Sequence, residues 1–118
     1  MHDFRFSLKE SERGQHYRMF YVLWFGDVAL SVQASTAHYC YPRLTLAPLK
    51  YNSWELALLR NGYLVDPRID PVMRGAEKLI DKDHWERGPC PVGGHIPTKT
   101  VQAIIDHLEQ KAKAQQLT

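Results

Sequence analysis

The chain has little cysteine, little net charge and no long hydrophobic run. No stretch of about 18 consecutive apolar residues occurs in its 118 residues, so no segment is expected to cross a membrane as a helix. The opening residues, MHDFRFSLKE, lack the apolar core of a signal peptide, which predicts a cytoplasmic protein. The formal net charge of +2 neither demands nucleic acid as a partner nor excludes it.

Only two cysteines, Cys40 and Cys90, are present. In a reducing cytoplasm a structural disulfide between them is not expected. Free cysteine packs like a small apolar residue, so the simplest interpretation is two buried or half-buried thiols. The length fits one domain, and the content of 44% hydrophobic and 24% charged residues is that of an ordinary globular protein.

The first part of the chain has the alternation and composition of β-strands. Phe4–Leu8 alternates between apolar and polar residues and predicts a short strand, and the charged stretch KESERG after it predicts a turn. Gln15–Gly26 is rich in aromatic and β-branched residues, which favour a strand over the helix that its length also permits. With a turn at Phe25–Asp27 and the alternating Val28–Ser35, it predicts an antiparallel hairpin.

The segment Ser53–Pro67 is compatible with two structures. Its apolar residues alternate as in a strand, and Asn61–Gly62 is a hairpin signal. A helix over the same residues would be capped at Asn52 and would end at Gly62. We favour the strand, with an extended connection or edge strand over YPRLTLAPLKYN before it.

The second part of the chain predicts helices. A short helix is expected over Pro71–Asp81, a glycine- and proline-rich loop over Glu86–Pro97, and a long helix from Thr98, which can cap it. Apolar residues of the long helix recur at i, i+3, i+4 and i+7, namely Val101, Ile104, Ile105 and Leu108. Beyond Lys111 the apolar stripe ends, so residues 112–118 are expected to fray.

Strands followed by helices indicate an α+β fold. We predict a single domain over residues 1–118, mainly β to residue 66 and mainly α from 67, in which the C-terminal helix packs on one face of a small antiparallel sheet. The strand within Gln15–Phe25 is apolar on both faces. The sheet face without the long helix therefore needs the Pro71–Asp81 helix, a second copy of the chain or another protein to cover it.

The segment AHYCYPR concentrates aromatic and polar groups after the predicted hairpin. Pro42 forces the residue before it into an extended conformation, which predicts a rigid turn at the rim of the sheet. Tyrosine and arginine are residue types that protein interfaces favour. The candidate partner-binding residues are therefore His38, Tyr39, Tyr41 and Arg43.

The same segment supports an alternative in which the protein is a small enzyme. His38 and Cys40, with Cys90 and His95 from the later loop, supply a Cys₂His₂ set of zinc ligands, although H-x-C is not a usual zinc-knuckle spacing. Cys40 could instead act as a nucleophile activated by a histidine and by Arg43. Since no thiol-hydrolase signature is present, we favour a binding protein without a cofactor over a zinc or thiol enzyme.

Two other ligands have weaker support in the sequence. The stretch PVGGHIPTKT leads into a helix N-terminus but lacks the phosphate-binding pattern G-x-x-x-x-G-K-[ST]. Single-stranded nucleic acid remains a second alternative, because basic and aromatic side chains on a sheet face stack and neutralise such strands. The residues that would do so are Arg18, Arg43, Lys50, Arg60, Arg68 and Arg74, with Tyr17, Tyr39, Tyr41 and Tyr51.

Three stretches, VQASTAHYCYPR, YNSWELAL and VGGHIPTKTVQAIIDHL, together resemble a pattern in small phage and prophage proteins of no established activity. The resemblance covers the central and C-terminal parts of the chain and transfers no functional residue. It implies a mobile-element gene expressed in a bacterial cytoplasm. By analogy with small phage proteins, it further implies binding to a host protein or nucleoprotein complex, and a homodimer is a further expectation.

Overall fold

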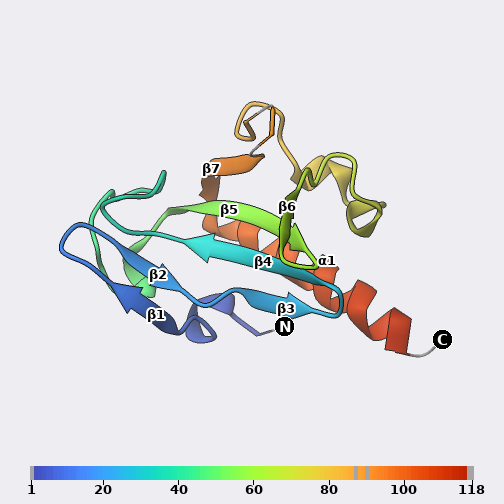
Figure 1. The fold of residues 1–118 in the computed structure, drawn as a ribbon, viewed down its shortest axis with the longest axis horizontal. Helices are drawn as coiled ribbons and strands as arrows, with labels where there is room; N and C mark the ends of the chain where they lie inside the picture. The colour runs from blue at the N-terminus through green and yellow to red at the C-terminus, as the bar shows by residue number, and fades with distance from the viewer. Residues whose placement is uncertain (1, 87, 90, 117–118) are drawn as a thin grey trace.

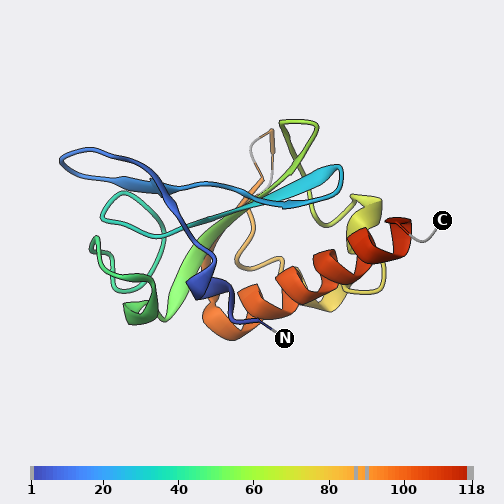
Figure 2. The ribbon, with the colours of Figure 1, turned by 90° about the horizontal axis from the view of Figure 1, so that it is seen from below.

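The computed structural model describes residues 2–86, 88–89 and 91–116. It shows the α+β fold that the sequence predicts: antiparallel strands form one layer and a single long helix, α1 (Thr98–Gln116), forms the other (Figure 1). Seen along the sheet, α1 lies against one face only (Figure 2). Among the described residues, no helix is long and apolar enough to cross a membrane.

The main sheet has five strands centred on the longest of them. β5 pairs with β4 along one edge, and on its other edge it pairs with β6 near its end and with β7 near its start. β3 pairs with β4 and is the outermost strand on that side. The bounds are β3 Leu23–Phe25, β4 Val28–Gln33, β5 Ser53–Arg60, β6 Tyr63–Val65 and β7 Val92–Pro97.

Both predicted hairpins are confirmed. β3 and β4 are joined by Gly26–Asp27, and β5 and β6 by Asn61–Gly62. Asn61 and Gly62 have φ of 53° and 83°, the left-handed conformation that a tight two-residue hairpin turn requires. Ser53–Arg60 is therefore a strand, as favoured, and not a helix.

The N-terminal predictions need correction. Phe4–Leu8 is not a strand: Phe4–Phe6 is a 3₁₀ turn, η1, in which the Asp3 carboxylate accepts the Arg5 N–H at 3.0 Å and the Phe4 ring packs against Trp54. The stretch predicted as a turn contains a strand, β1 (Glu10–Arg13), which pairs with β2 (Arg18–Phe20).

Gln15–Gly26 is two strands, β2 and β3, rather than one. The amide of Gln33 on β4 accepts from the Phe20 N–H at 2.7 Å and donates to the Phe20 carbonyl at 2.9 Å. A side chain thus replaces a rung of the backbone ladder, so β2 lies beside β4 without joining the main sheet. Tyr21, between the two strands, donates its N–H to the Lys9 carbonyl instead.

The second half departs from the predictions in three places. Pro71–Asp81 is two 3₁₀ turns, η3 (Pro71–Met73) and η4 (Glu77–Leu79), because Gly75, at φ 91°, breaks the helical path. Within the predicted loop Glu86–Pro97, Val92–Pro97 forms β7 against β5, so the second half is not wholly α. α1 extends to Gln116, past the start of the predicted fraying at 112.

The core lies between the sheet and α1. Trp54 is at its centre, buried, and its indole N–H donates to the hydroxyl of Thr98, the first residue of α1. Thr98 donates in turn to the Tyr51 carbonyl, so it links helix to sheet. The other main contributors are Leu30, Val32, Leu56, Leu58, Ile96, Val101, Ile104 and Leu108.

The opposite face of the main sheet is exposed at its outer strands, since Trp24 and Leu64 are 65% and 41% exposed, whereas Ala29 between them is buried. η3 and η4 contact α1 and lie in the helix layer (Figure 2), so the Pro71–Asp81 segment does not cover this face. Since successive strand residues point to opposite faces, one apolar row crosses this face through four strands in register. The row is Trp24, Ala29, Leu59 and Leu64.

Candidate functional site

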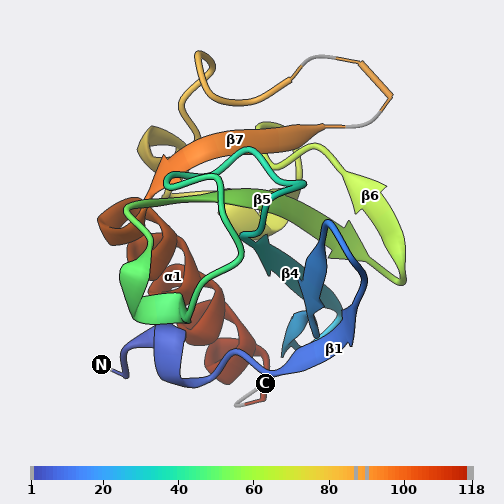
Figure 3. The same cartoon turned by 90° about the vertical axis from the view of Figure 1, so that its left-hand side faces the viewer.

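The segment AHYCYPR forms a turn at one end of the sheet, between β4 and β5. We call the side chains of Tyr39, Tyr41 and Arg43 the aromatic rim. Tyr39 and Tyr41 are 47% and 63% exposed, and Arg43 is also exposed. Figure 3 faces this end of the molecule, where the chain between β4 and β5 passes across β5 and β7.

Backbone bonds hold the rim in place from three directions. The Tyr39 N–H donates to the Glu55 carboxylate of β5 at 2.8 Å, and the His95 N–H of β7 donates to the Tyr39 carbonyl at 2.9 Å. The Tyr41 carbonyl accepts from the Asn52 N–H at 2.8 Å. The backbone at both tyrosines is therefore bound to distant parts of the chain.

The exposed side chains of the rim interact with one another. The Arg43 guanidinium lies 5.3 Å from the centre of the Tyr39 ring and donates to the Thr36 carbonyl at 3.1 Å. On the β7 side, the Tyr39 ring lies 6.1 Å from the His95 ring. The hydroxyl groups of Tyr39 and Tyr41 form no hydrogen bond within the described residues, so they remain available to a partner.

His38, the fourth candidate, points inward. It is buried, and its Nδ1 lies 2.7 Å from the Ser35 hydroxyl. Burial lowers the pKa of the His38 imidazole, and Arg18 and Arg43 lower it further, against the opposite effect of Glu55. His38 therefore supports the turn from below, and the surface that a partner can reach consists of the other three candidates.

The four residues of the zinc hypothesis are not all described, since Cys90 lies outside the described residues. Cys40 is buried, its Sγ donates to the Ser35 and Pro42 carbonyls, and burial raises the pKa of its thiol. His95 is exposed. Within the described ranges, no three metal-binding side chains form a group. This geometry favours a neutral structural thiol at Cys40 over a thiolate ligand or nucleophile.

The Ser35 hydroxyl lies 2.7 Å from His38 Nδ1, the distance expected of a nucleophile and its general base, but the pair has no other feature of a catalytic site. Ser35 is fully buried, and its hydroxyl accepts the Ala37 N–H at 3.2 Å. A substrate could not reach this oxygen without unfolding the turn. The pair is therefore structural.

A buried arginine fixes the far side of the same loop. Arg18 donates to the Leu46 carbonyl at 2.6 Å, to the Ala34 carbonyl at 2.5 Å and to the Tyr51 hydroxyl at 3.1 Å. Its guanidinium also stacks on Phe20 at 4.2 Å. The sequence suggested Arg18 as a nucleic-acid contact, but its burial makes it a structural residue.

Sequence analysis missed two residues that position the rim. In the sequence, Glu55 is one polar residue of an alternating strand. Its hydrogen bond to the Tyr39 N–H joins residues that only the fold brings together. Gly94 lies directly beneath Tyr39: a Cβ built on Gly94 would be 3.0 Å from the Tyr39 Cβ. The Gly93–Gly94 pair was the available signal, since adjacent glycines in a strand mark a close approach.

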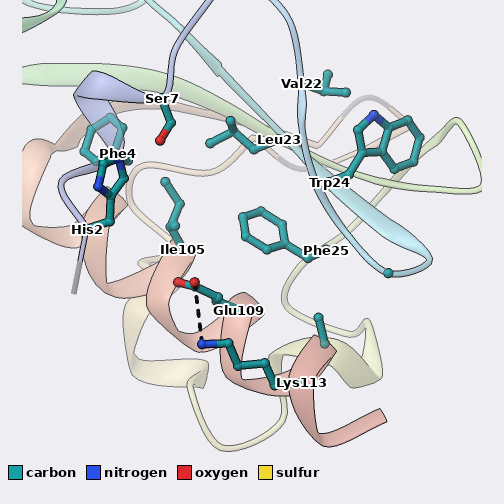
Figure 4. Close-up of a pocket in the computed structure, with 12 residues that line it drawn as sticks. His2, Phe4, Ser7, Val22, Leu23, Trp24, Phe25, Ile105, Glu109 and Lys113 are labelled. Atoms are coloured by element: carbon teal, nitrogen blue, oxygen red, sulfur yellow. Dashed lines mark ion pairs between the residues drawn. The ribbon is translucent and has the colours of Figure 1, made fainter. Parts of the chain in front are cut away.

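A second surface lies at the opposite end of the sheet. A groove of about 480 Å³ runs between β3, η1 and the second half of α1. Leu23, Phe25 and Ile105 point into it, and Glu109 and Lys113 of α1 form an ion pair along its wall (Figure 4). Sequence analysis identified the aromatic strand but not the groove beside it.

No family model, curated protein or solved structure matches the chain.

Proposed function

We propose that this protein is a cytoplasmic binding protein of a bacterial cell, and that it holds another protein through the aromatic rim. One observation carries the proposal: exposed Tyr39, Tyr41 and Arg43 project from a backbone that β5 and β7 hold by hydrogen bonds. Because the rim is ordered before a partner arrives, binding loses little conformational entropy.

The chemistry of the rim defines the partner surface. Two tyrosine rings provide apolar contact area, and their hydroxyl groups and the Arg43 guanidinium provide donors. A partner segment with a carboxylate opposite Arg43 and carbonyl groups opposite the tyrosines would satisfy them. Tyrosine and arginine are also the residue types that contribute most to binding at protein interfaces. The resemblance to small phage proteins makes a host protein or nucleoprotein complex the natural target.

The alternative of single-stranded nucleic acid has less support. Of the basic residues proposed for it, Arg18 is buried, while Arg60 and Arg68 form ion pairs with Asp70 and Asp66. The Arg43 guanidinium and the His95 ring both lie near the Tyr39 ring, at 5.3 Å and 6.1 Å from its centre, which restricts stacking of a base there. A protein partner therefore fits the rim better.

A site-specific crosslink tests the proposal. A photoreactive phenylalanine analogue at Tyr39 or at Tyr41, in protein expressed in bacteria, should capture one discrete partner. The matched control is the same analogue at Tyr63 in β6, which is 77% exposed but lies outside the rim. Arg43→Ala should reduce the crosslink yield at Tyr39 and Tyr41 by about tenfold, the effect of losing one strong charged contact.

Two results would overturn the proposal. The first is the same set of crosslinked proteins from Tyr63 as from Tyr39 and Tyr41. The second is a crosslink yield that is unchanged in Arg43→Ala and in a Tyr39→Ala variant probed at Tyr41. Crosslinks to nucleic acid alone, lost steeply with added salt, would support the alternative.

A further inference from the structure

Two outer strands of the described main sheet, β3 and β6, carry neither a charged residue nor a proline, unlike β1 and β7. β1 carries charged residues and a bulge between Glu10 and Glu12, both of which discourage further pairing. β7 contains Pro97 and is bridged by Trp85 at Gly93. β3 has the sequence Leu-Trp-Phe and pairs with β4, and β6 has the sequence Tyr-Leu-Val and pairs with β5. The two edges differ in their surroundings, because all three residues of β3 line the groove beside α1 and no residue of β6 does.

The backbone of β3 is arranged to accept another strand. The two-residue turn makes Phe25 and Val28 the hydrogen-bonded pair that closes the hairpin. Hydrogen-bonding directions alternate along an antiparallel strand, so the N–H and C=O of Trp24 point away from β4. A second strand laid antiparallel to β3 would find these groups at its centre.

Apolar surface surrounds this edge on both faces of the sheet. On the face away from α1, the Trp24 side chain is 65% exposed and ends the apolar row, in which the neighbouring Ala29 is buried. On the helix side, the groove presents Leu23 and Phe25 (Figure 4). A strand added here would bury apolar groups above and below the new pair.

We propose that β3 pairs with β3 of a second copy of this chain, about a two-fold axis at Trp24. Such pairing places the two Trp24 side chains opposite each other and joins the two apolar rows into one. It also brings the two α1 helices into the same layer, running in opposite directions. The groove wall carries one acid and one base, Glu109 and Lys113, one helical turn apart.

This charge pattern favours a second copy over an unrelated peptide. A two-fold axis presents the same surface twice, so each Glu109 can face the other copy's Lys113, and the wall complements itself. The ion pair within one copy is long, at 3.8 Å, and exposed, so exchange across the axis loses little. The dimer does not depend on the proposed function, because the aromatic rim lies at the other end of the sheet.

Sedimentation equilibrium of the untagged full chain tests the dimer. The wild-type protein should be a concentration-dependent dimer, and Trp24→Lys should be monomeric at the same concentrations. Tyr63→Lys, at the exposed edge strand β6, is the matched control and should dimerise as the wild type does. Circular dichroism should show both variants folded, because Trp24 and Tyr63 are exposed.

A charge exchange tests the arrangement of the helices. Glu109→Lys should weaken dimerisation by about tenfold, and the double variant with Lys113→Glu should restore it, since the exchange recreates the same pairs. Exchange of the Trp24 amide hydrogen should slow as protein concentration rises.

The proposal is overturned if the wild type remains monomeric at millimolar concentration, if Trp24→Lys and Tyr63→Lys have equal effects, or if a co-purifying peptide occupies the β3 edge in a monomer. Alanine substitutions at the rim should leave the dimer intact, so this test is separate from that of the proposed function.

Discussion

The aromatic rim and the β3 edge present opposite kinds of surface. At the rim the backbone at Tyr39 and Tyr41 is bonded, and the exposed chemistry is in side chains. At the β3 edge the backbone of Trp24 is open on one side, and the surrounding side chains are apolar. Side-chain donors select a partner by its chemistry, whereas an open strand edge accepts any strand that fits. This difference supports the two proposals, a specific partner at the rim and self-association at the β3 edge.

The largest effect is expected from replacing Arg18, which holds the loop that carries the rim. Arg18→Met should lower the free energy of unfolding by about 3 kcal/mol, because a buried side chain loses three hydrogen bonds and the Leu46 carbonyl loses its donor. Trp24→Lys, at the other surface, should change it by less than about 0.5 kcal/mol at protein concentrations where the wild type is also monomeric. Urea unfolding of the two variants measures both. Equal effects would show that the rim is no more tightly coupled to the fold than the edge is.

The pH dependence of the free energy of unfolding should distinguish the rim from the β3 edge. Among the described residues, His38 beneath the rim is the one buried histidine. The folded-state pKa of His38 is lowered from 6.5, so the unfolded chain takes up a proton more readily than the fold does. The contribution of His38 to stability is complete above the unfolded-state pKa of 6.5 and is lost as the pH falls below it. The free energy of unfolding should therefore decrease as the pH is lowered from 6.5.

His38→Gln should flatten this decrease, and urea unfolding at several pH values measures it. Asp66 and Asp70, whose pKa values are lowered from 3.8 by ion pairs with Arg68 and Arg60, lose their contributions at lower pH and leave this window to His38. An unchanged slope in His38→Gln would contradict the assignment.

The smallest effect is expected from a methyl group beneath the rim. Gly94→Ala places a Cβ 3.0 Å from the Tyr39 Cβ, so Tyr39 must shift by a few tenths of an ångström. The free energy of unfolding should change by less than about 1 kcal/mol, while crosslinking from Tyr41 should fall several-fold. The dimerisation constant should be unchanged. A shift in dimerisation instead would mean that the two surfaces are coupled.

The parts of this fold that local signals determine were predictable. The Asn61–Gly62 turn, the alternation of Ser53–Arg60 and the apolar stripe of the C-terminal helix each correspond to the structure. The division of Gln15–Gly26 was not predictable, because it depends on the side chain of Gln33 bonding to Phe20. β7 was also missed, since glycine and proline suggest a loop and only pairing with β5 makes it a strand.

The candidate site was likewise predictable from the sequence only in part. The pattern AHYCYPR identified Tyr39, Tyr41 and Arg43, and all three are exposed in the structure. The inward position of His38 and Cys40 depends on the bonds that each makes to Ser35. Neither Glu55 nor His95 could be assigned to the rim, because their contacts with Tyr39 join segments far apart in the chain.

The bond between His95 and Tyr39 also sets the order in which the two surfaces can form. The β3–β4 hairpin is formed by residues that are neighbours in the sequence. The rim, in contrast, needs β7, which is synthesised more than fifty residues after Tyr39. The proposed pairing through β3 therefore uses a strand that is synthesised before β7, on which the rim depends, although the groove beside β3 is complete only with α1.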